Sequence, residues 1–257
     1  MLNFKNTNIV FILAVFVLAG IHLLYGLSVW AYVALAFIYS LVVFYGCYFV
    51  DSNFFFPVIC SAKTARKEIA ITFDDGPAVN CTPEILKVLR DFRVHGAFFC
   101  IGNRIAGNEE LLKEVDRQGH IIGNHSFSHH FWFDLFPAEK VKKDLASMDD
   151  ALLKVIGRKP RLFRPPYGVT NPNLKKAVFA GRYTAVGWNI RSLDTVISDE
   201  QKLLNRVIRG LKPGGIILFH DTSRTTLNIL ASLIRHVKAN GYEIVRLDKL
   251  LNLEPYA

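Results

Sequence analysis

The stretch 8–50 contains no Lys, Arg, Asp or Glu, and this constrains the fold more than any other feature of the sequence. The core of a lipid bilayer is about 30 Å thick, so one helix crosses it with roughly 20 apolar residues. The stretch is long enough for two such helices, and Gly26-Leu27-Ser28 near its middle is typical of a turn. We therefore expect two transmembrane helices, over about 9–25 and 30–50, joined in a hairpin.

Two other interpretations of this stretch are a signal peptide and a pair of buried core helices. Lys5 and the pair Ala19-Gly20 weakly resemble the charged start and the cleavage region of a signal peptide. Cleavage there would leave the second apolar run in place, which argues against simple secretion. The expected organisation is a transmembrane hairpin at 1–50, a juxtamembrane linker at 51–66 and one domain at 67–257, in an integral membrane protein whose partner is the bilayer.

The net charge of +9 is carried almost entirely by residues after 60. A basic domain beside a membrane suits anionic head groups or an acidic glycan, although ordinary solubility explains the charge equally well. The cations are scattered, which argues against nucleic acid, and nothing predicts a protein partner. Two spans return the chain to its starting side, and Lys5, Lys63, Arg66 and Lys67 favour the cytoplasmic face for the domain.

From about residue 67 onward, segments typical of strands alternate with segments typical of helices. One helix is expected to begin at Thr82-Pro83-Glu84, with the Thr82 hydroxyl as its cap. The alternation predicts an α/β domain with a mainly parallel sheet, while the pattern alone leaves open whether that sheet closes. The seven expected strands are 68–73, 96–102, 120–126, 161–166, 183–190, 215–221 and 242–247.

Titratable side chains collect where these expected strands end. In a parallel α/β fold the carboxyl ends of the strands share one face, which is where such folds place active sites. We therefore expect one site at that face. The residues concerned are Asp74, Asp75, His125, His129, Arg164, Tyr167, Asp194, His220 and Asp221.

His125 and His129 stand four residues apart, a spacing that places two imidazoles on one side of a helical turn. Two histidines and a carboxylate are a common catalytic zinc set, with a fourth position open. Such a pair alone is more often unrelated to metal, but the acids Asp74 and Asp75 on the same face reverse that balance. His130 is expected to point elsewhere.

Asp74 and Asp75 would repel each other unless positive groups separate their roles. A metal ion on one and an arginine on the other would do so, and FRPPYG at 163–168 supplies Arg164 before a stiff turn. His220 offers an imidazole on the same face, suited to general acid catalysis near neutral pH.

Five segments in order resemble the motifs of the polysaccharide deacetylase family, the NodB homology domain of carbohydrate esterase family four. They are TFDDGP at 72–77, HSFSH at 125–129, RPPYG at 164–168, WNIRSLD at 188–194 and LFH at 218–220. The resemblance spans about 67–250 and implies a distorted (β/α) barrel with about seven strands. It also implies one metal ion, usually Zn²⁺, with Co²⁺ or Ni²⁺ as alternatives.

The resemblance also implies roles for single residues. Asp75, His125 and His129 would bind the metal, and Asp74 would be the general base, oriented by Arg164. His220 would be the general acid, tuned by Asp194, and the Tyr167 backbone N–H would stabilise the oxyanion. The expected substrate-binding residues are Leu218, which would line the acyl pocket, with Pro165, Tyr167 and Trp188.

The fourth motif departs from the family pattern. Many members have Asp-x-x-Asp-Trp where this chain has Arg191 at the first position and Thr195 at the last, so the acyl pocket is expected to differ. His130-Phe131-Trp132 also lacks the usual proline.

The sequence therefore predicts a membrane-anchored, metal-dependent hydrolase acting on linear amide C–N bonds. It would remove the N-acetyl or another N-acyl group from an amino sugar in a glycan or a lipid-linked saccharide. The alternative is a catalytically inactive glycan-binding or scaffold member of the same fold, and the completeness of the motif set favours the enzyme.

Overall fold

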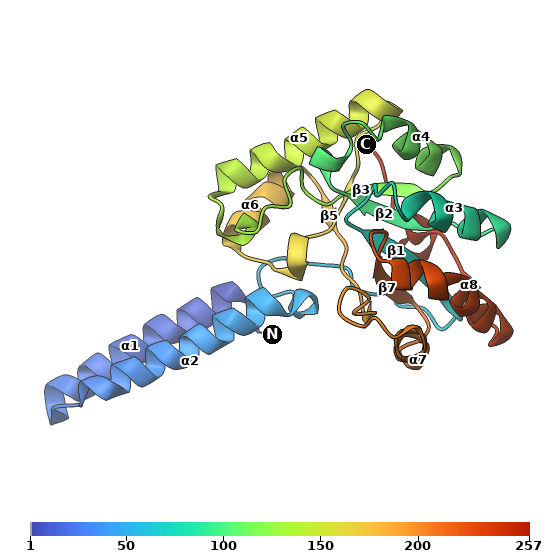
Figure 1. The fold of residues 1–257 in the computed structure, drawn as a ribbon. Helices are drawn as coiled ribbons and strands as arrows, with labels where there is room; N and C mark the ends of the chain where they lie inside the picture. Colours follow the sequence, from blue (N-terminus) through green and yellow to red (C-terminus); the bar gives the residue numbers. More distant parts are fainter. Residues whose placement is uncertain (1) are drawn as a thin grey trace.

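The computed structural model describes residues 2–257 and begins with two antiparallel helices that project from the rest of the molecule (Figure 1). They are α1 (Phe4–Tyr25) and α2 (Val29–Tyr48). Gly26, with φ of 69°, ends α1, so the turn lies where the sequence predicted it. Both helices are long and apolar enough to cross a membrane by length and composition. The first begins at Phe4 rather than near residue 9, because the Asn3 side chain caps it by accepting a hydrogen bond from the Asn6 N–H.

The remainder is one curled sheet surrounded by helices, and every strand pair in it is parallel. Along the sheet the strand order is β5-β4-β3-β2-β1-β7-β6, with β8 pairing to β1. The strands are β1 (Glu68–Asp74), β2 (Ala97–Cys100), β3 (Ile121–Asn124), β4 (Leu162–Phe163), β5 (Thr184–Ala185), β6 (Ile190–Arg191), β7 (Gly215–His220) and β8 (Glu243–Ile244). The predicted fold class, a distorted α/β barrel, is confirmed.

Helices cover the outer face of this sheet. Ile69, Ile71 and Phe73 of β1 pack in the large cluster that includes the helices α3, α4, α7 and α8, whereas Ala70 faces the interior with residues of α9. This alternation is the period of two that a strand imposes, and it turns Thr72 and Asp74 inward as well. The helices are α3 (Thr82–Asp91), α4 (Glu109–Arg117), α5 (Ala138–Ile156), α6 (Pro172–Ala180), α7 (Glu200–Arg209), α8 (Arg224–Ala239) and α9 (Leu247–Leu251).

The segment predicted as one strand over 183–190 is in fact two short strands at opposite edges of the sheet. Its start, β5, pairs with β4, and its end, β6, begins at Ile190 and pairs with β7. The residues between them cross from one edge to the other: the Val186 N–H still donates to the Phe163 carbonyl of β4 at 2.8 Å, and the Asn189 N–H already donates to the Ile216 carbonyl of β7 at 3.3 Å. The sequence pattern left open whether the sheet closes; in the part of the chain that the structure describes it is curled, with β5 and β6 as its two edges.

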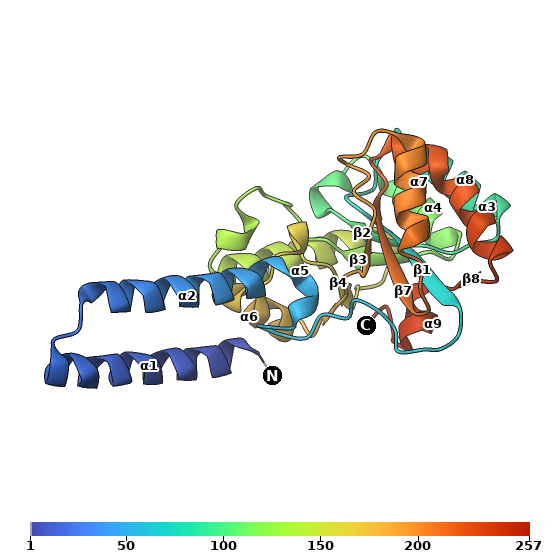
Figure 2. The ribbon, with the colours of Figure 1, turned by 90° about the horizontal axis from the view of Figure 1, so that it is seen from below.

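The hairpin is attached to the domain at its open end, where α1 begins and α2 finishes (Figure 2). The Thr170 backbone N–H and hydroxyl donate to the carbonyls of Cys47 and Gly46, at 3.1 and 3.0 Å. The Phe4 N–H donates to the Phe54 carbonyl at 2.9 Å. Because these bonds join backbone to backbone or to a buried hydroxyl, the end of the hairpin is fixed to the turn that follows β4.

Candidate active site

The two adjacent aspartates lie at the end of β1 and both reach one cavity. Asp74 is the last residue of the strand and is 3% exposed. Asp75 follows with φ of 74°, in the left-handed region that few non-glycine residues adopt. This turn breaks the strand alternation, so two neighbours in the sequence face the same space, as expected.

Asp75 lies between His125 and His129, with its Oδ1 3.5 Å from the Nε2 of each histidine. The three donor atoms lie within 4.8 Å of one another. Asp75 Oδ1 is buried and has no hydrogen-bond donor among the described residues. A buried carboxylate oxygen aimed at two imidazole nitrogens fits a divalent metal ion, because a cation would satisfy all three.

His125 is oriented for this role by the backbone. Its Nδ1 lies 2.9 Å from the carbonyl oxygen of Arg164, which can only accept, so Nδ1 carries the proton. The Nε2 lone pair then remains free for a metal. Burial, reinforced by the charge of His125, lowers the pKa of His129, which favours the neutral form that binds metals.

The two histidines do not stand on a helical turn, and the reasoning from their spacing was wrong. The segment after β3 is a loop in which Ser126 and His129 have φ of 67° and 41°. The Ser126 hydroxyl accepts a hydrogen bond from the His129 N–H at 2.9 Å and closes the loop. The convergence was predicted correctly, but a tight loop produces it.

Arg164 is fully buried and holds Asp74. Its Nη1 donates to Asp74 Oδ1 at 2.6 Å and to the Thr72 hydroxyl at 2.8 Å. Nε and Nη2 donate to the carbonyls of Val186 and Gly187, in the segment that crosses between the sheet edges. A guanidinium fixed by four bonds leaves Asp74 one free oxygen, Oδ2, which lies 3.8 Å from His125 Nε2.

His220 ends β7 on the other side of the cavity and is paired with Asp194. Its Nδ1 lies 2.8 Å from Asp194 Oδ1, and its backbone N–H donates to Oδ2 at 2.7 Å. Burial by itself would lower the pKa of His220, but the hydrogen bond and charge of Asp194, with the charges of Asp74 and Asp75, raise it to about 9. The ring is therefore a cation with a proton to give at neutral pH.

Two residues to which the sequence analysis gave no role keep Asp194 in place. The Thr226 hydroxyl donates to Asp194 Oδ2 at 2.5 Å, and the Ser192 hydroxyl donates to Oδ1 at 3.0 Å. Ser192 lies within the fourth motif, two residues before Asp194, whereas Thr226 comes from the first turn of α8 and has no motif to mark it.

The other candidate side chains line one cavity of about 250 Å³. Of the predicted site residues, Arg164, Asp194 and Asp221 lie behind its wall, and the rest form part of the wall. Tyr167 occupies the turn after β4 with φ of 58°, and its ring packs on His129 at 4.7 Å between centroids. The lining residues are Asp74, Asp75, His125, His129, Pro165, Tyr167, Gly168, Trp188, Arg191, Leu193, Thr195, Val196, Leu218 and His220.

The backbone around the cavity is strained. Of the non-glycine residues with positive φ in the described chain, Asp75, His129, Tyr167 and Leu193 line the cavity and Ser126 supports it. Such conformations cost about 1–3 kcal/mol each and persist where the surroundings hold them. Their concentration here makes this cavity the candidate functional site.

The turn after Asp75 rests on a buried acid, Asp221, which the sequence placed on this face without a role. The Thr82 hydroxyl donates to Asp221 Oδ2 at 2.5 Å and accepts from the Ala78 N–H. Thr82 is therefore not the cap of α3, which begins after Cys81, but a support for the turn. Burial raises the pKa of Asp221 to about 7.

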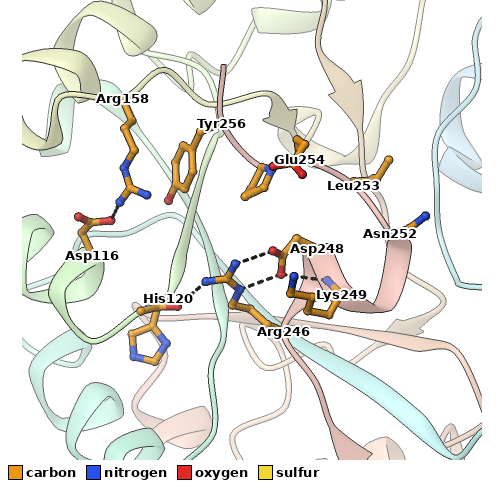
Figure 3. Close-up of a pocket in the computed structure, with 12 residues that line it drawn as sticks. Asp116, His120, Arg158, Arg246, Asp248, Lys249, Asn252, Leu253, Glu254 and Tyr256 are labelled. Atoms are coloured by element: carbon orange, nitrogen blue, oxygen red, sulfur yellow. Dashed lines mark hydrogen bonds and ion pairs between the residues drawn. The ribbon is translucent and has the colours of Figure 1, made fainter.

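A second cavity, of about 400 Å³, lies away from this site against the last residues of the chain (Figure 3). Two ion pairs hold four of its charged side chains: Arg246 pairs with Asp248 at 2.5 Å, and Arg158 pairs with Asp116. Arg246 also donates to the Gly119 carbonyl. None of the predicted site residues lines it, and it carries no functional assignment.

The fold and the site together define a class of protein: a curled α/β barrel with a metal-competent Asp-His-His cluster, a buried acid and a charged histidine at the carboxyl ends of its strands. Comparison with known proteins agrees. A sequence profile described as polysaccharide deacetylase matches residues 61–186. A peptidoglycan-N-acetylglucosamine deacetylase of Bacillus cereus is 34% identical over 191 residues, which cover 72% of this chain and 89% of that protein.

Two further comparisons point the same way. The peptidoglycan-N-acetylmuramic acid deacetylase PdaA of Bacillus subtilis is 33% identical over 193 residues, covering 74% of this chain and 73% of that protein. A crystal structure of a peptidoglycan N-acetylglucosamine deacetylase superposes with a TM-score of 0.74 at 25% identity, covering 78% of this chain and 95% of that chain. The chain belongs to the polysaccharide deacetylase family, and the predicted enzyme class, a hydrolase of N-acetyl amide bonds, is confirmed.

Proposed function

We propose that this protein is a membrane-anchored, metal-dependent N-deacetylase of an amino sugar, either in peptidoglycan or in a lipid-linked saccharide. One observation carries the proposal: Asp74, the Asp75-His125-His129 cluster and His220 line a single cavity. The domain division that goes with it is a transmembrane hairpin at 1–50, a linker at 51–66 and a deacetylase domain at 67–257.

The residues divide the reaction between two sides of the cavity. Asp75, His125 and His129 would hold a divalent metal ion, Zn²⁺ by the character of the donor set, with Co²⁺ or Ni²⁺ as alternatives. Such an ion would supply Lewis-acid polarisation of the acetyl carbonyl and activation of a water. Asp74, held at Oδ1 by Arg164, takes the proton of the attacking water at its free Oδ2.

On the opposite side, the charged His220 ring gives its proton to the leaving amine, and Asp194 keeps the ring oriented. The Tyr167 N–H, in the strained turn, is the proposed donor to the oxyanion. One such donor typically contributes about 3–4 kcal/mol to catalysis. Leu218, Pro165 and Trp188 form the apolar wall beside the acetyl group.

The direct test is acetate release. The full-length protein in detergent, loaded with Zn²⁺, Co²⁺ or Ni²⁺, is incubated with N-acetylglucosamine oligomers, peptidoglycan and lipid-linked saccharides. Acetate release from at least one substrate supports the proposal. Stoichiometric metal binding without acetate release, or the absence of metal from the native protein, would instead support the inactive glycan-binding or scaffold member.

The side of the membrane is a separate question. The cations at Lys5, Lys63, Arg66 and Lys67 favour the cytoplasmic face, where a lipid-linked saccharide would be the substrate. The names of the relatives in Bacillus state peptidoglycan, which favours the outer face. We propose the cytoplasmic face on the charge rule.

A cysteine introduced at exposed Ala239 tests this proposal. It should react with a membrane-impermeant maleimide only after the cells are permeabilised. Labelling in intact cells would place the domain outside.

A further inference from the structure

Beside the candidate active site, three large apolar side chains of one short loop are exposed. Phe131, Trp132 and Leu135 are 72%, 57% and 72% exposed, and we call residues 131–135 the aromatic loop. The Phe131 and Trp132 rings pack edge to face at 4.7 Å between centroids. Apolar side chains of this size gathered on one surface mark an interaction site.

The aromatic loop is continuous with the attachment of the hairpin. Phe133 and Phe136, next to the exposed residues, point inward and belong to the apolar cluster in which Val42, Val43 and Cys47 of α2 also pack. The same cluster includes residues of α6, and both ribbon views place α6 and the start of α5 beside the attached end of the hairpin (Figures 1 and 2). The aromatic loop therefore lies beside the end of the hairpin that is attached to the domain.

Basic side chains accompany this surface. The Lys140 ammonium lies 3.5 Å from the centre of the Phe136 ring. The acids from the aromatic loop to the end of the second turn of α5 are Asp134, Glu139 and Asp144. Glu139 pairs with Lys142 at 2.7 Å, and Asp144 accepts a hydrogen bond from the Phe127 N–H. The other cations on the first turns of α5 and on α6 are Lys143, Lys175 and Lys176. Exposed aromatic residues with lysines on the neighbouring helices are typical of the head-group layer of an anionic bilayer.

The loop is also continuous with the active site. Phe131, Trp132, Asp134, Leu135 and Tyr167 line a shallow cavity of about 330 Å³, and Tyr167 is at the same time a wall of the active-site cavity. Whatever covers the aromatic loop therefore lies at the mouth of the active site.

We propose that the aromatic loop enters the head-group layer of the bilayer that holds the hairpin and keeps the mouth of the active site at the membrane surface. The inference rests on the membrane anchoring proposed above. It restricts the substrates to N-acetylated saccharides presented at that surface, because a soluble polymer would have to approach from the bilayer side.

Tryptophan quenching tests this without reference to activity. The chain has three tryptophans, Trp30, Trp132 and Trp188. The full-length protein and its Trp132→Phe and Trp30→Phe variants are reconstituted in anionic phospholipid vesicles, with and without phospholipids brominated in the upper acyl chain. We expect loss of the Trp132 emission in brominated vesicles, measured as the quenching that disappears in Trp132→Phe.

A matched control uses the far end of α5. Leu153 is 40% exposed, and its neighbour Leu152 packs in the cluster of the sheet rather than with the hairpin. Leu153→Trp in the Trp132→Phe background should add emission that brominated lipid does not quench. Quenching at position 153 equal to that at Trp132 would overturn the proposal, because the loop would then have no special depth.

Quenching of Trp30, the second residue of α2, tests the membrane anchoring independently of the aromatic-loop proposal. Quenching of Trp30 without quenching of Trp132 would overturn the aromatic-loop proposal and leave the anchoring intact. Absence of both would overturn both. Two other results would also overturn the proposal. If Trp132 is not quenched but its emission shifts when N-acetylglucosamine oligomers are added, the loop binds a glycan. If Trp132 is not quenched and its replacement converts a dimer to a monomer, the loop binds a second copy of the chain.

Discussion

Asp74 and Asp75 are neighbours in the sequence that end in opposite surroundings. Asp74 forms an ion pair with the buried guanidinium of Arg164. Asp75 lies beside two imidazole nitrogens, and its Oδ1 accepts no hydrogen bond from the described residues. At the scale of single residues, the contacts of each side chain therefore determine which chemical role it can take.

The first prediction concerns Asp74. Asp74→Asn keeps the shape of the side chain but removes the base, so acetate release should fall by about 10²–10⁴-fold. Metal content should be unchanged, measured by atomic absorption. The matched control is Asp248→Asn, which also removes a buried carboxylate bonded to an arginine but lies in the second cavity. Equal loss in both variants would mean that the effect is one of folding.

The second prediction concerns the pair of His220 and Asp194. Because the pKa of His220 is raised to about 9, acetate release should persist up to that pH and decline above it. In Asp194→Asn the decline should move down towards the ordinary histidine pKa of about 6.5. The pH profile of kcat/KM measures the shift, and an unmoved alkaline limb would contradict the assigned pairing.

The same pair predicts how stability depends on pH. The folded-state pKa of His220 lies above its unfolded value, so its contribution to the free energy of unfolding is fully present below about pH 6.5. It is lost as the pH rises through about 9. Between these two pH values the melting temperature should therefore fall more steeply with pH in the wild type than in Asp194→Asn.

The third prediction concerns Arg191, which stands where many family members have an acid. It lines the cavity, and its guanidinium lies 6.0 Å from the centre of the Trp188 ring. A cation there favours a substrate with a carboxylate or phosphate near the acetyl group. Arg191→Gln should raise KM for such substrates about tenfold, or about 1.4 kcal/mol, and leave neutral oligomers unaffected. Equal effects on both classes would rule out charge recognition.

At the scale of elements, the turns that follow the strands are as well supported as the strands themselves. The turn after β1 has almost no space: a Cβ on Gly76 would lie 2.1 Å from Asp221 Oδ2. The carboxyl of Asp221 is in turn held by Thr82 of α3. Three elements therefore meet behind Asp74 and Asp75.

Gly76→Ala should consequently destabilise the protein by about 1–3 kcal/mol, because neither the backbone nor the held carboxyl can move freely. It should also reduce metal affinity, since Asp75 is the preceding residue. Gly20→Ala is the control: a Cβ there meets nothing within 4 Å, and the change should stay within about 1 kcal/mol. Denaturant or thermal unfolding measures both.

At the scale of the whole molecule, the site unites segments that are far apart in the sequence, from Asp74 to His220, so a bound metal ion should stabilise the entire domain. The fifth prediction is that Zn²⁺ at 100 times its dissociation constant raises the free energy of unfolding by about 2.7 kcal/mol. Chelation should abolish both this gain and acetate release. Asp75→Asn should lose the gain, whereas Asp91→Asn, an exposed acid on α3, should retain it.

The elements and the site residues were predictable from the sequence to different degrees. Apolar runs and capping residues located the helices: the pair Asn171-Pro172 is typical of a helix start, and Asn171 caps α6 by accepting a hydrogen bond from the Leu174 N–H. The segment 183–190 reads as one strand because its composition is that of a strand. Composition cannot show that its two ends pair with opposite edges of the sheet.

What the sequence determined by itself is therefore local and ordered: an apolar stretch long enough for two spans, alternating strands and helices, and titratable residues where strands end. Only the tertiary structure decided which partner each acid meets, that a loop rather than a helix brings His125 to His129, and that Thr82 supports Asp221. It also decided that the aromatic loop lies beside the hairpin. The physical reason is that hydrogen bonds and burial depend on groups brought together by the curled sheet, and a linear pattern carries no information on such distances.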